Sequence, residues 1–235
     1  MKIEPIGFLR TCFGSKFAVP RQPGLCGSAW GVLEFCEAYR SAEAVRGLDG
    51  FSHVWLIFGF HETVAEGWHP TVRPPRLGGN ERVGVFASRS TYRPNGLGLS
   101  LVKFDGFGWE EDHGMQPPLL HFSGVDLVDG TPVYDVKPYL AYAEALVEAR
   151  SGYATEEIRR WDVKVDESAE ADFVKLDERS RRVIKEVLSL DPRPAGGAGE
   201  AGRVYGASLC GRNVRFRFDG AICWILEIQY PQSGV

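Results

Sequence analysis

The sequence predicts a mainly β protein, in which a sheet closed or folded over itself is followed by a small domain of helix and sheet. Short apolar runs separated by turn residues fill the first 140 of the 235 residues. The pattern changes around residues 141–153, where Ser151-Gly152 indicates a boundary. One amphipathic helical pattern and three further strand-like runs come after it. We therefore expect an N-terminal domain over residues 1–150 and an α+β C-terminal domain over residues 155–235.

The N-terminal strands are predicted from runs rich in Val, Ile, Leu, Phe and Trp. A short helix is expected among them at residues 41–47, because Ala42, Ala44 and Val45 precede Gly47, a typical stop signal. The runs cover residues 3–9, 30–36, 53–60, 82–87, 97–104, 119–125 and 133–136.

The C-terminal part begins with a charged segment and then a helical pattern. Apolar side chains recur at helical spacing from residue 169 to residue 190, which predicts one helix. Pro192 ends it, because proline cannot continue a helix. Strand-like runs follow at residues 204–209, 213–218 and 221–229, and Asp219-Gly220 predicts a hairpin between the last two.

Composition narrows the class of protein. With 44% hydrophobic and 25% charged residues, the chain is typical of a globular protein with an apolar core. No secretory signal follows Met1, and no run approaches the roughly 18 apolar residues of a membrane helix. We expect a cytoplasmic protein that binds no membrane. The five cysteines are odd in number and never spaced Cys-x-x-Cys, which favours buried or inert free thiols over disulfides or a zinc site.

The net charge of −4 conceals two basic clusters. Such local patches can bind an anion on an acidic protein, although arginines that only solvate a face would give the same pattern. One cluster lies between residues 68 and 103 and the other after Pro192. Their members are Arg73, Arg76, Arg82, Arg89, Arg93 and Lys103, and Arg193, Arg203, Arg212, Arg215 and Arg217.

Two motifs are poor guides to function. The Gly-x-Gly-x-x-Gly pattern at residues 197–202 lacks the preceding strand and following helix of a dinucleotide site, which favours a flexible loop. His61, Glu62 and His69 do not have the His-Glu-x-x-His spacing of a zinc site, and Pro70 would disturb a helix there. The sequence predicts no metal site.

Four stretches combine cations, acids, hydroxyls and glycines: residues 16–24, 60–62, 88–100 and 126–139. Each by itself could be only a turn. Their density of functional groups is nevertheless typical of binding loops carried on a rigid scaffold.

At these stretches the sequence resembles the TrmO/YaeB family of tRNA adenine-N(6) methyltransferases. The matching strings are FAVPRQPG (17–24), TVRPPRLGG (71–79), VFASRSTYRPN (85–95), LVDGTPVYDVKPY (127–139) and DPRP (191–194). The resemblance implies a β-barrel that binds S-adenosylmethionine, and a C-terminal domain that helps to hold tRNA. It also implies a homodimer with the cofactor near the subunit interface. The implied substrate is the adenosine 3′ of the anticodon, already carrying a threonylcarbamoyl group. The expected partners are therefore tRNA and a second copy, and not DNA.

The resemblance also assigns the cofactor site. Arginine suits a carboxylate, so Arg89 would pair with that of the cofactor. His61 and Glu62 would bind the ribose hydroxyls or the ammonium, and Leu99 would pack on the adenine. The complete set is Gln22, Pro23, Gly24, His61, Glu62, Arg89, Leu99, Asp129, Gly130, Thr131 and Pro132.

Methyl transfer is an in-line displacement, in which orientation can contribute about 7–11 kcal/mol. The acceptor amine is a poor nucleophile and must lose a proton. Asp135 is the candidate base, with Asn95, Lys137 and Tyr139 orienting the substrate. The alternative is that Asp135 and Lys137 form a surface ion pair, worth about 0–1 kcal/mol.

Anticodon loops are recognised by phosphate contacts and by stacking on aromatic or arginine faces. Arg215 and Arg217 alternate along a strand and should share one face. The RNA-binding candidates are Tyr92, Arg93, Arg193, Arg203, Tyr205, Arg212, Arg215 and Arg217.

Two positions depart from the family pattern. Gly96 replaces a usual proline, which predicts a looser turn, and Gly196 stands where a tyrosine often follows the DPRP motif. Two other functions remain open: the same cofactor site acting on another RNA or a small molecule, and a non-catalytic regulator that binds a nucleotide or RNA.

Overall fold

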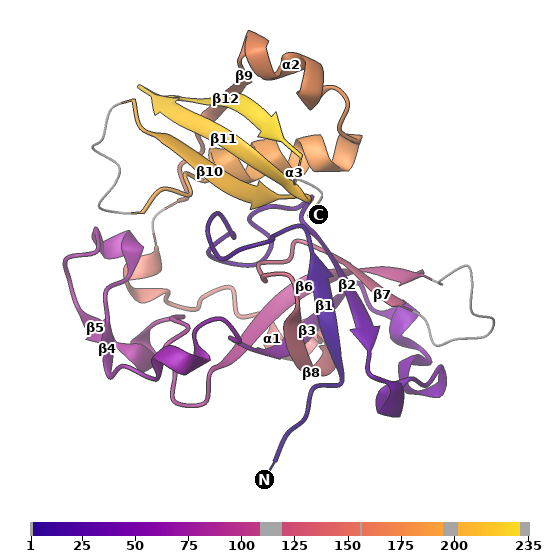
Figure 1. The fold of residues 1–235 in the computed structure, drawn as a ribbon. Helices are drawn as coiled ribbons and strands as arrows, with labels where there is room; N and C mark the ends of the chain where they lie inside the picture. The colour runs from indigo at the N-terminus through magenta and orange to yellow at the C-terminus, as the bar shows by residue number, and fades with distance from the viewer. Residues whose placement is uncertain (1, 109–118, 156, 195–201, 231–235) are drawn as a thin grey trace.

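The N-terminal part is a closed barrel of six antiparallel strands in the order β1-β2-β7-β6-β3-β8 (Figure 1). This is a computed structural model, and it describes residues 2–108, 119–155, 157–194 and 202–230. The prediction of a closed, mainly β sheet is confirmed. The barrel strands are β1 (Gly7–Thr11), β2 (Trp30–Phe35), β3 (His53–Gly59), β6 (Leu97–Gly108), β7 (Leu119–Ser123) and β8 (Thr131–Pro138).

Side chains that alternate along the strands fill the barrel interior. In β3, Val54, Leu56 and Phe58 are buried, whereas Trp55 and Ile57 point to the outer face. Each large apolar side chain buried in this way contributes about 1.5–3 kcal/mol. Because the interior is packed, a ligand must bind at the rim or on the outer face of the barrel.

Short elements decorate the barrel loops. A two-stranded hairpin joins β4 (Thr71–Val72) to β5 (Val83–Gly84), and a single α-helical turn, α1 (Ala141–Glu144), follows the barrel. The 3₁₀ turns are η1 (Glu37–Tyr39), η2 (Glu43–Val45), η3 (Leu48–Gly50), η4 (Val64–Glu66), η5 (Pro75–Leu77), η6 (Val85–Ala87) and η7 (Gly152–Ala154).

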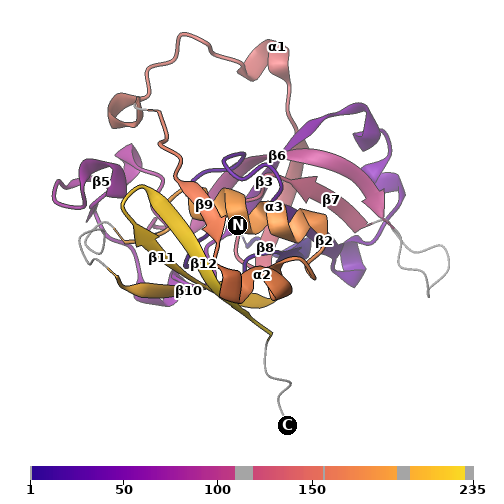
Figure 2. The same ribbon diagram turned by 90° about the horizontal axis from the view of Figure 1, so that it is seen from above.

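The C-terminal part is a four-stranded sheet in the order β10-β11-β12-β9, with two helices (Figure 1). β9 runs parallel to β12, and the other neighbours are antiparallel. Seen from above, α3 lies across the barrel beside this sheet (Figure 2). The elements are β9 (Asp162–Val165), α2 (Glu167–Phe173), α3 (Glu178–Ser189), β10 (Val204–Leu209), β11 (Arg212–Asp219) and β12 (Ile222–Gln229).

The single helix predicted over residues 169–190 is wrong, because the structure divides it into α2 and α3. Asp177 caps α3: its Oδ1 accepts a hydrogen bond from the Ser180 amide at 2.9 Å. An N-cap residue has extended backbone, so the helical pattern cannot continue through it. Apolar spacing did not reveal the break, since Phe173 and Val183 are buried on both sides of it.

Other boundaries also differ from the predictions. The helix expected at residues 41–47 is only the 3₁₀ turn η2, and the strand expected at residues 82–87 is two residues of β5 followed by η6. The first strand begins at Gly7 rather than at residue 3. β9 was not predicted, because its charged sequence becomes a strand only by pairing with β12.

All five cysteines are free; Cys12, Cys26 and Cys223 are buried, and Cys36 and Cys210 are half-buried. The prediction of buried free thiols is therefore confirmed for three of them.

Most of the glycine pattern at residues 197–202 lies outside the described residues, as does Gly196. No helix in the described ranges is long and apolar enough to cross a membrane.

Candidate functional site

A cavity of about 760 Å³ lies at the rim of the barrel. It is lined by residues from all four stretches in which the sequence concentrates functional groups. The fold thus brings together residues from distant parts of the chain, such as Lys16 and Thr131. The lining comes from residues 16–22, 55–63, 88–93, 97–100 and 126–131.

Six of the expected cofactor residues line this cavity: Gln22, His61, Glu62, Arg89, Leu99 and Thr131. Arg89 Nη1 donates a hydrogen bond of 2.5 Å to Gln22 Oε1, which joins two of the loops. His61, Glu62 and Leu99 are exposed at the end of β3 and the start of β6. The cavity therefore has a guanidinium, an imidazole, a carboxylate and an aliphatic surface on its wall.

The other five expected cofactor residues lie beside the lining. Asp129 Oδ1 accepts a hydrogen bond from the Thr11 amide at 2.8 Å, and the Gly130 amide donates to the Leu9 carbonyl at 2.9 Å. Both contacts fix the turn before β8 to β1. Gly24, with φ of 78°, likewise donates to the Gly124 carbonyl at 2.8 Å. Pro23 and Pro132 adjoin these turns.

Asp126 is a cavity residue that was not among the sequence-based candidates. Ser100 Oγ donates a hydrogen bond of 2.7 Å to Asp126 Oδ1, and Ser100 itself is buried. Burial raises the pKa of Asp126 to about 6, although the Ser100 hydrogen bond and the charge of Arg89 act in the opposite direction. Its position as the first acid of the stretch at residues 126–139 was the available signal.

The expected catalytic residues do not line the cavity, but three of them lie on the adjoining barrel face. Asp135 and Lys137 in β8 pair with Ile57 and Trp55 of β3, and both β3 residues line the cavity. The Tyr139 ring meets the Trp55 ring edge-on, with 6.1 Å between centroids.

The alternative considered for Asp135 and Lys137 was a surface ion pair between them. In the described part of the chain, no ion pair joins Asp135 to Lys137; Asp135 Oδ1 accepts from the Val136 amide at 2.9 Å instead. Asn95 is exposed in the turn before β6. This turn contains a hydrogen bond from the Gly96 amide to the Arg93 carbonyl at 3.0 Å. Gly96 has φ of 59°, a conformation that proline cannot adopt.

Tyr92 and Arg93 line the cavity and are held by local contacts. Tyr92 Oη donates to Glu66 Oε2 at 3.0 Å, and this hydrogen bond raises the pKa of Tyr92. Arg93 Nη1 donates to the Ser88 carbonyl at 2.9 Å, and its guanidinium lies 5.8 Å from the exposed Phe86 ring.

Three C-terminal arginines make contacts within their own domain. Arg193 binds both carboxylate oxygens of Asp191 at 2.7 Å, and its guanidinium lies 3.9 Å from the Phe218 ring. Arg193 is thus engaged inside the domain rather than presented to solvent. Arg203 lies over the ring of the buried Tyr205, at 5.1 Å, and Arg212 lies over Tyr230, at 4.2 Å.

Arg215 and Arg217 share the outer face of β11, as predicted from their alternation, because Val214, Phe216 and Phe218 are buried on the other face. Arg217 pairs across the sheet with Trp224, and Lys164 Nζ lies 5.8 Å from the Trp224 ring. Arg215 forms an ion pair of 3.1 Å with Glu227. This face therefore presents cations beside a half-buried aromatic ring.

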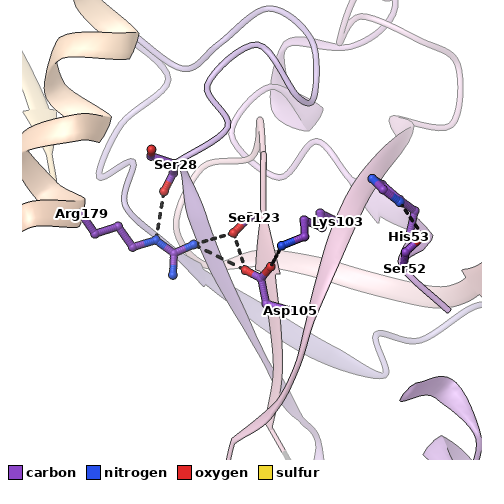
Figure 3. A network of polar contacts seen from close by, with 7 residues as sticks. All are labelled: Ser28, Ser52, His53, Lys103, Asp105, Ser123 and Arg179. Atoms are coloured by element: carbon purple, nitrogen blue, oxygen red, sulfur yellow. Dashed lines mark hydrogen bonds and ion pairs between the residues drawn. The ribbon is translucent and has the colours of Figure 1, made fainter. Parts of the chain in front are cut away.

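Helix α3 holds the loop that leads from the cavity to β2. Glu186 Oε2 accepts from the Ser28 amide at 3.0 Å, and Arg179 Nε donates to the Ser28 carbonyl at 3.1 Å. Arg179 also donates to Ser123 Oγ at 2.7 Å and lies 3.6 Å from Asp105 Oδ2 (Figure 3). The loop that carries Gln22 is thus held by both the barrel and the C-terminal domain.

Two family models match the chain. The tRNA-methyltransferase O N-terminal domain matches residues 8–145, which include the barrel, and the C-terminal domain of the same family matches residues 159–231.

The chain belongs to the tRNA-methyltransferase O family.

Two of the relatives in this family are similar to the chain over almost their full length. The chain is 47% identical over 225 residues to the tRNA (adenine(37)-N6)-methyltransferase of Escherichia coli, covering 94% of both chains. It is 42% identical over 220 residues to a putative S-adenosylmethionine-dependent methyltransferase of Pseudomonas aeruginosa, covering 92% of both. The crystal structure of TrmO from Pseudomonas aeruginosa superposes with a TM-score of 0.79 at 36% identity, over 97% of both chains.

Proposed function

We propose that this chain transfers a methyl group from S-adenosylmethionine to N6 of adenine 37 in tRNA. Its 47% identity to the Escherichia coli enzyme over 94% of both chains carries this proposal. The cavity supports it independently, because about 760 Å³ is within the usual range for a site that encloses a small molecule.

The donor fits the residues on the cavity wall. When bound, S-adenosylmethionine supplies a methyl group carried on a positively charged sulfur. Arg89 would bind its carboxylate, His61 and Glu62 its ribose hydroxyls, and Leu99 its adenine. Gln22 and Thr131 would line the same pocket. Pro23, Gly24, Asp129, Gly130 and Pro132 would act through the backbone of the turns that they fix.

The acceptor amine would enter over the barrel face beside the cavity. Asp135 would accept the proton that the amine loses, and Lys137, Tyr139 and Asn95 would orient the nucleotide. Apart from Asn95, these residues lie next to Trp55 and Ile57, which also line the cavity, and this supports their role. The acceptor amine and its base would then meet without reaching through the packed interior of the barrel.

The tRNA would be held by cations near the cavity and on the outer face of the C-terminal sheet. Tyr92 and Arg93 lie at the cavity, and Arg215 and Arg217 lie on the sheet face. Arg203 directly precedes β10, and Arg212 is the first residue of β11. The burial of Tyr205 in β10 and the pairing of Arg193 with Asp191 favour structural roles for those two residues. We retain residues 1–150 as the proposed methyltransferase domain and residues 155–235 as the proposed tRNA-binding domain, working in the cytoplasm.

We also propose a homodimer with the cavity near the subunit interface. Support comes from large apolar side chains exposed around the barrel, because exposed apolar patches commonly mark an interaction surface. These side chains are Phe86, Leu99, Tyr142, Leu146 and Val147. Light scattering on the purified protein, which gives its mass in solution, would test the proposal, and a single-chain mass would contradict it.

The activity is tested with labelled S-adenosylmethionine and two tRNA preparations. One comes from cells able to install threonylcarbamoyl-adenosine, and the other from cells unable to do so. Labelling of the first alone would establish both the reaction and the threonylcarbamoyl requirement. Cofactor binding without labelling of either tRNA would refute the tRNA substrate and indicate a different acceptor or a non-catalytic role.

A further inference from the structure

Two side chains of opposite charge, Arg89 and Asp126, line the same cavity. The described lining contains one other carboxylate, Glu62, which is exposed to solvent. The remaining charged or titratable lining residues are Lys16, Arg21, His61, Tyr92 and Arg93.

The amino-acid end of S-adenosylmethionine presents the complementary pair, an ammonium and a carboxylate on one carbon. A buried ammonium needs an anion, and an anion shielded from water binds it more strongly than an exposed one does. Asp126 meets this requirement better than Glu62 does. Its orientation is also fixed, because the buried Ser100 hydroxyl donates to it at 2.7 Å.

We propose that Asp126, held by Ser100, binds the ammonium of the methionine end of the cofactor, while Arg89, which lines the same cavity, binds the carboxylate. This inference rests on the proposed function, because it assigns one part of the same cofactor site. It leaves Glu62 and His61 to the ribose.

The assignment has a consequence for pH. In the empty cavity, burial raises the pKa of Asp126 to about 6. A bound ammonium favours the carboxylate form, so cofactor binding should release a proton near pH 6 and weaken as the pH falls below it. Other ionisable side chains, among them His61, line the same cavity. A variant at Asp126 is therefore needed to attribute the pH dependence to this carboxyl.

The test compares three ligands by calorimetry with the full-length protein and Asp126→Asn. S-adenosylmethionine and S-adenosylhomocysteine both carry the ammonium, whereas methylthioadenosine lacks the amino-acid end. Because Asp126→Asn removes one charged hydrogen bond, it should lower the affinity for the first two ligands by about 10- to 100-fold. The affinity for methylthioadenosine should fall by less than about twofold. The surface variant Asp172→Asn serves as the control, with all three affinities unchanged.

Two further measurements keep the test independent of folding. Asp126→Asn should lose most of the pH dependence of S-adenosylmethionine affinity between pH 5 and 8. Ser100→Ala keeps the carboxylate but removes a hydrogen bond that lowers its pKa, so the weakening should begin at a higher pH.

Different results would overturn the assignment. Weakening of S-adenosylmethionine alone would place Asp126 at the sulfonium, and equal weakening of all three ligands would indicate a general structural role. Unchanged affinities with slower methyl transfer would make Asp126 a proton acceptor instead. Failure of the unmodified protein to bind S-adenosylmethionine would refute the proposed function itself, which is a distinct result.

Discussion

At the scale of single residues, the cavity contains a group that is unfavourable for folding. Asp126 is a carboxyl whose burial raises its pKa to about 6, against an ordinary value of about 3.9. The folded protein therefore binds this proton more tightly than the unfolded chain does. Between about pH 4 and pH 6, rising pH ionises Asp126 at a cost to stability, and the full cost is present above pH 6. Such costs are common where binding requires a buried charge.

We predict that Asp126→Asn stabilises the protein without ligand at pH 8. The amide can still accept the Ser100 hydrogen bond and has no charge to desolvate, so the free energy of unfolding should rise by about 1–2 kcal/mol. At pH 4 the change should be small, because the native carboxyl is then protonated. Denaturant unfolding at both pH values measures this. An equal gain at the two pH values would mean that the charge is not the cause.

At the scale of elements, the break between α2 and α3 depends on one cap. Both Asp177 carboxylate oxygens accept from Ser180, from its amide at 2.9 Å and from its hydroxyl at 2.6 Å. These bonds lower the pKa of Asp177. The cap therefore stabilises the protein above about pH 4, and its contribution is lost as the pH falls further. The break turns α3 so that Arg179 and Glu186 reach the barrel loop.

We predict that Asp177→Ala lowers the free energy of unfolding by about 1 kcal/mol at pH 7, the usual effect of losing an N-cap. Asp172→Ala is the matched control: this residue lies in α2 and pairs only at the surface with Lys175, so its removal should change stability by less than about 0.5 kcal/mol. Chemical denaturation monitored by circular dichroism compares them. Equal effects would show that the cap has no special role.

At the scale of the whole molecule, the C-terminal domain holds the barrel through α3. Arg179 contacts Ser28, Ser123 and Asp105, which lie on three different parts of the barrel (Figure 3). Burial alone would raise the pKa of Asp105, but hydrogen bonds from Ser123 and Lys103 outweigh it and lower the pKa. The junction supports the loop that carries Gln22, so it should affect cofactor binding as well as stability.

We predict that Arg179→Ala lowers the free energy of unfolding by about 1–2 kcal/mol and weakens S-adenosylmethionine binding several-fold. A double-mutant cycle with Asp105→Asn should give a coupling of about 0.5–1 kcal/mol, since the pair is only partly buried. Arg182→Ala removes an exposed arginine of the same helix and should change neither quantity appreciably. Unaltered cofactor affinity in Arg179→Ala would show that the loop does not depend on the junction.

The outer face of the C-terminal sheet gives a prediction for RNA. If Arg217 neutralises a phosphate, Arg217→Ala should weaken tRNA binding and reduce the slope of log affinity against log salt by about one unit. Arg10→Ala is the control, because Arg10 belongs to the barrel and pairs there with Glu34. Filter binding at several salt concentrations measures both slopes. A slope unchanged by Arg217→Ala would remove this face from the proposed tRNA site.

Local sequence patterns were sufficient to predict the elements whose hydrogen-bonding partners are close in the chain. β10 was predicted to the residue, and the hairpin at Asp219-Gly220 was predicted from two residues. β9 was missed, since its four residues form a strand only beside the distant β12. The break at Asp177 was missed because apolar spacing continues across it.

The sequence by itself determined the class of fold, the strands of the barrel and the four stretches that supply the cavity, because alternating burial and turn chemistry act between near neighbours. Only the tertiary structure decided which groups face one another. It brought Asp126 and Arg89 to one cavity, put Asp135 on the adjoining face and engaged Arg193 with Asp191. Burial and charge depend on atoms brought together from distant segments, and a one-dimensional pattern does not contain those distances.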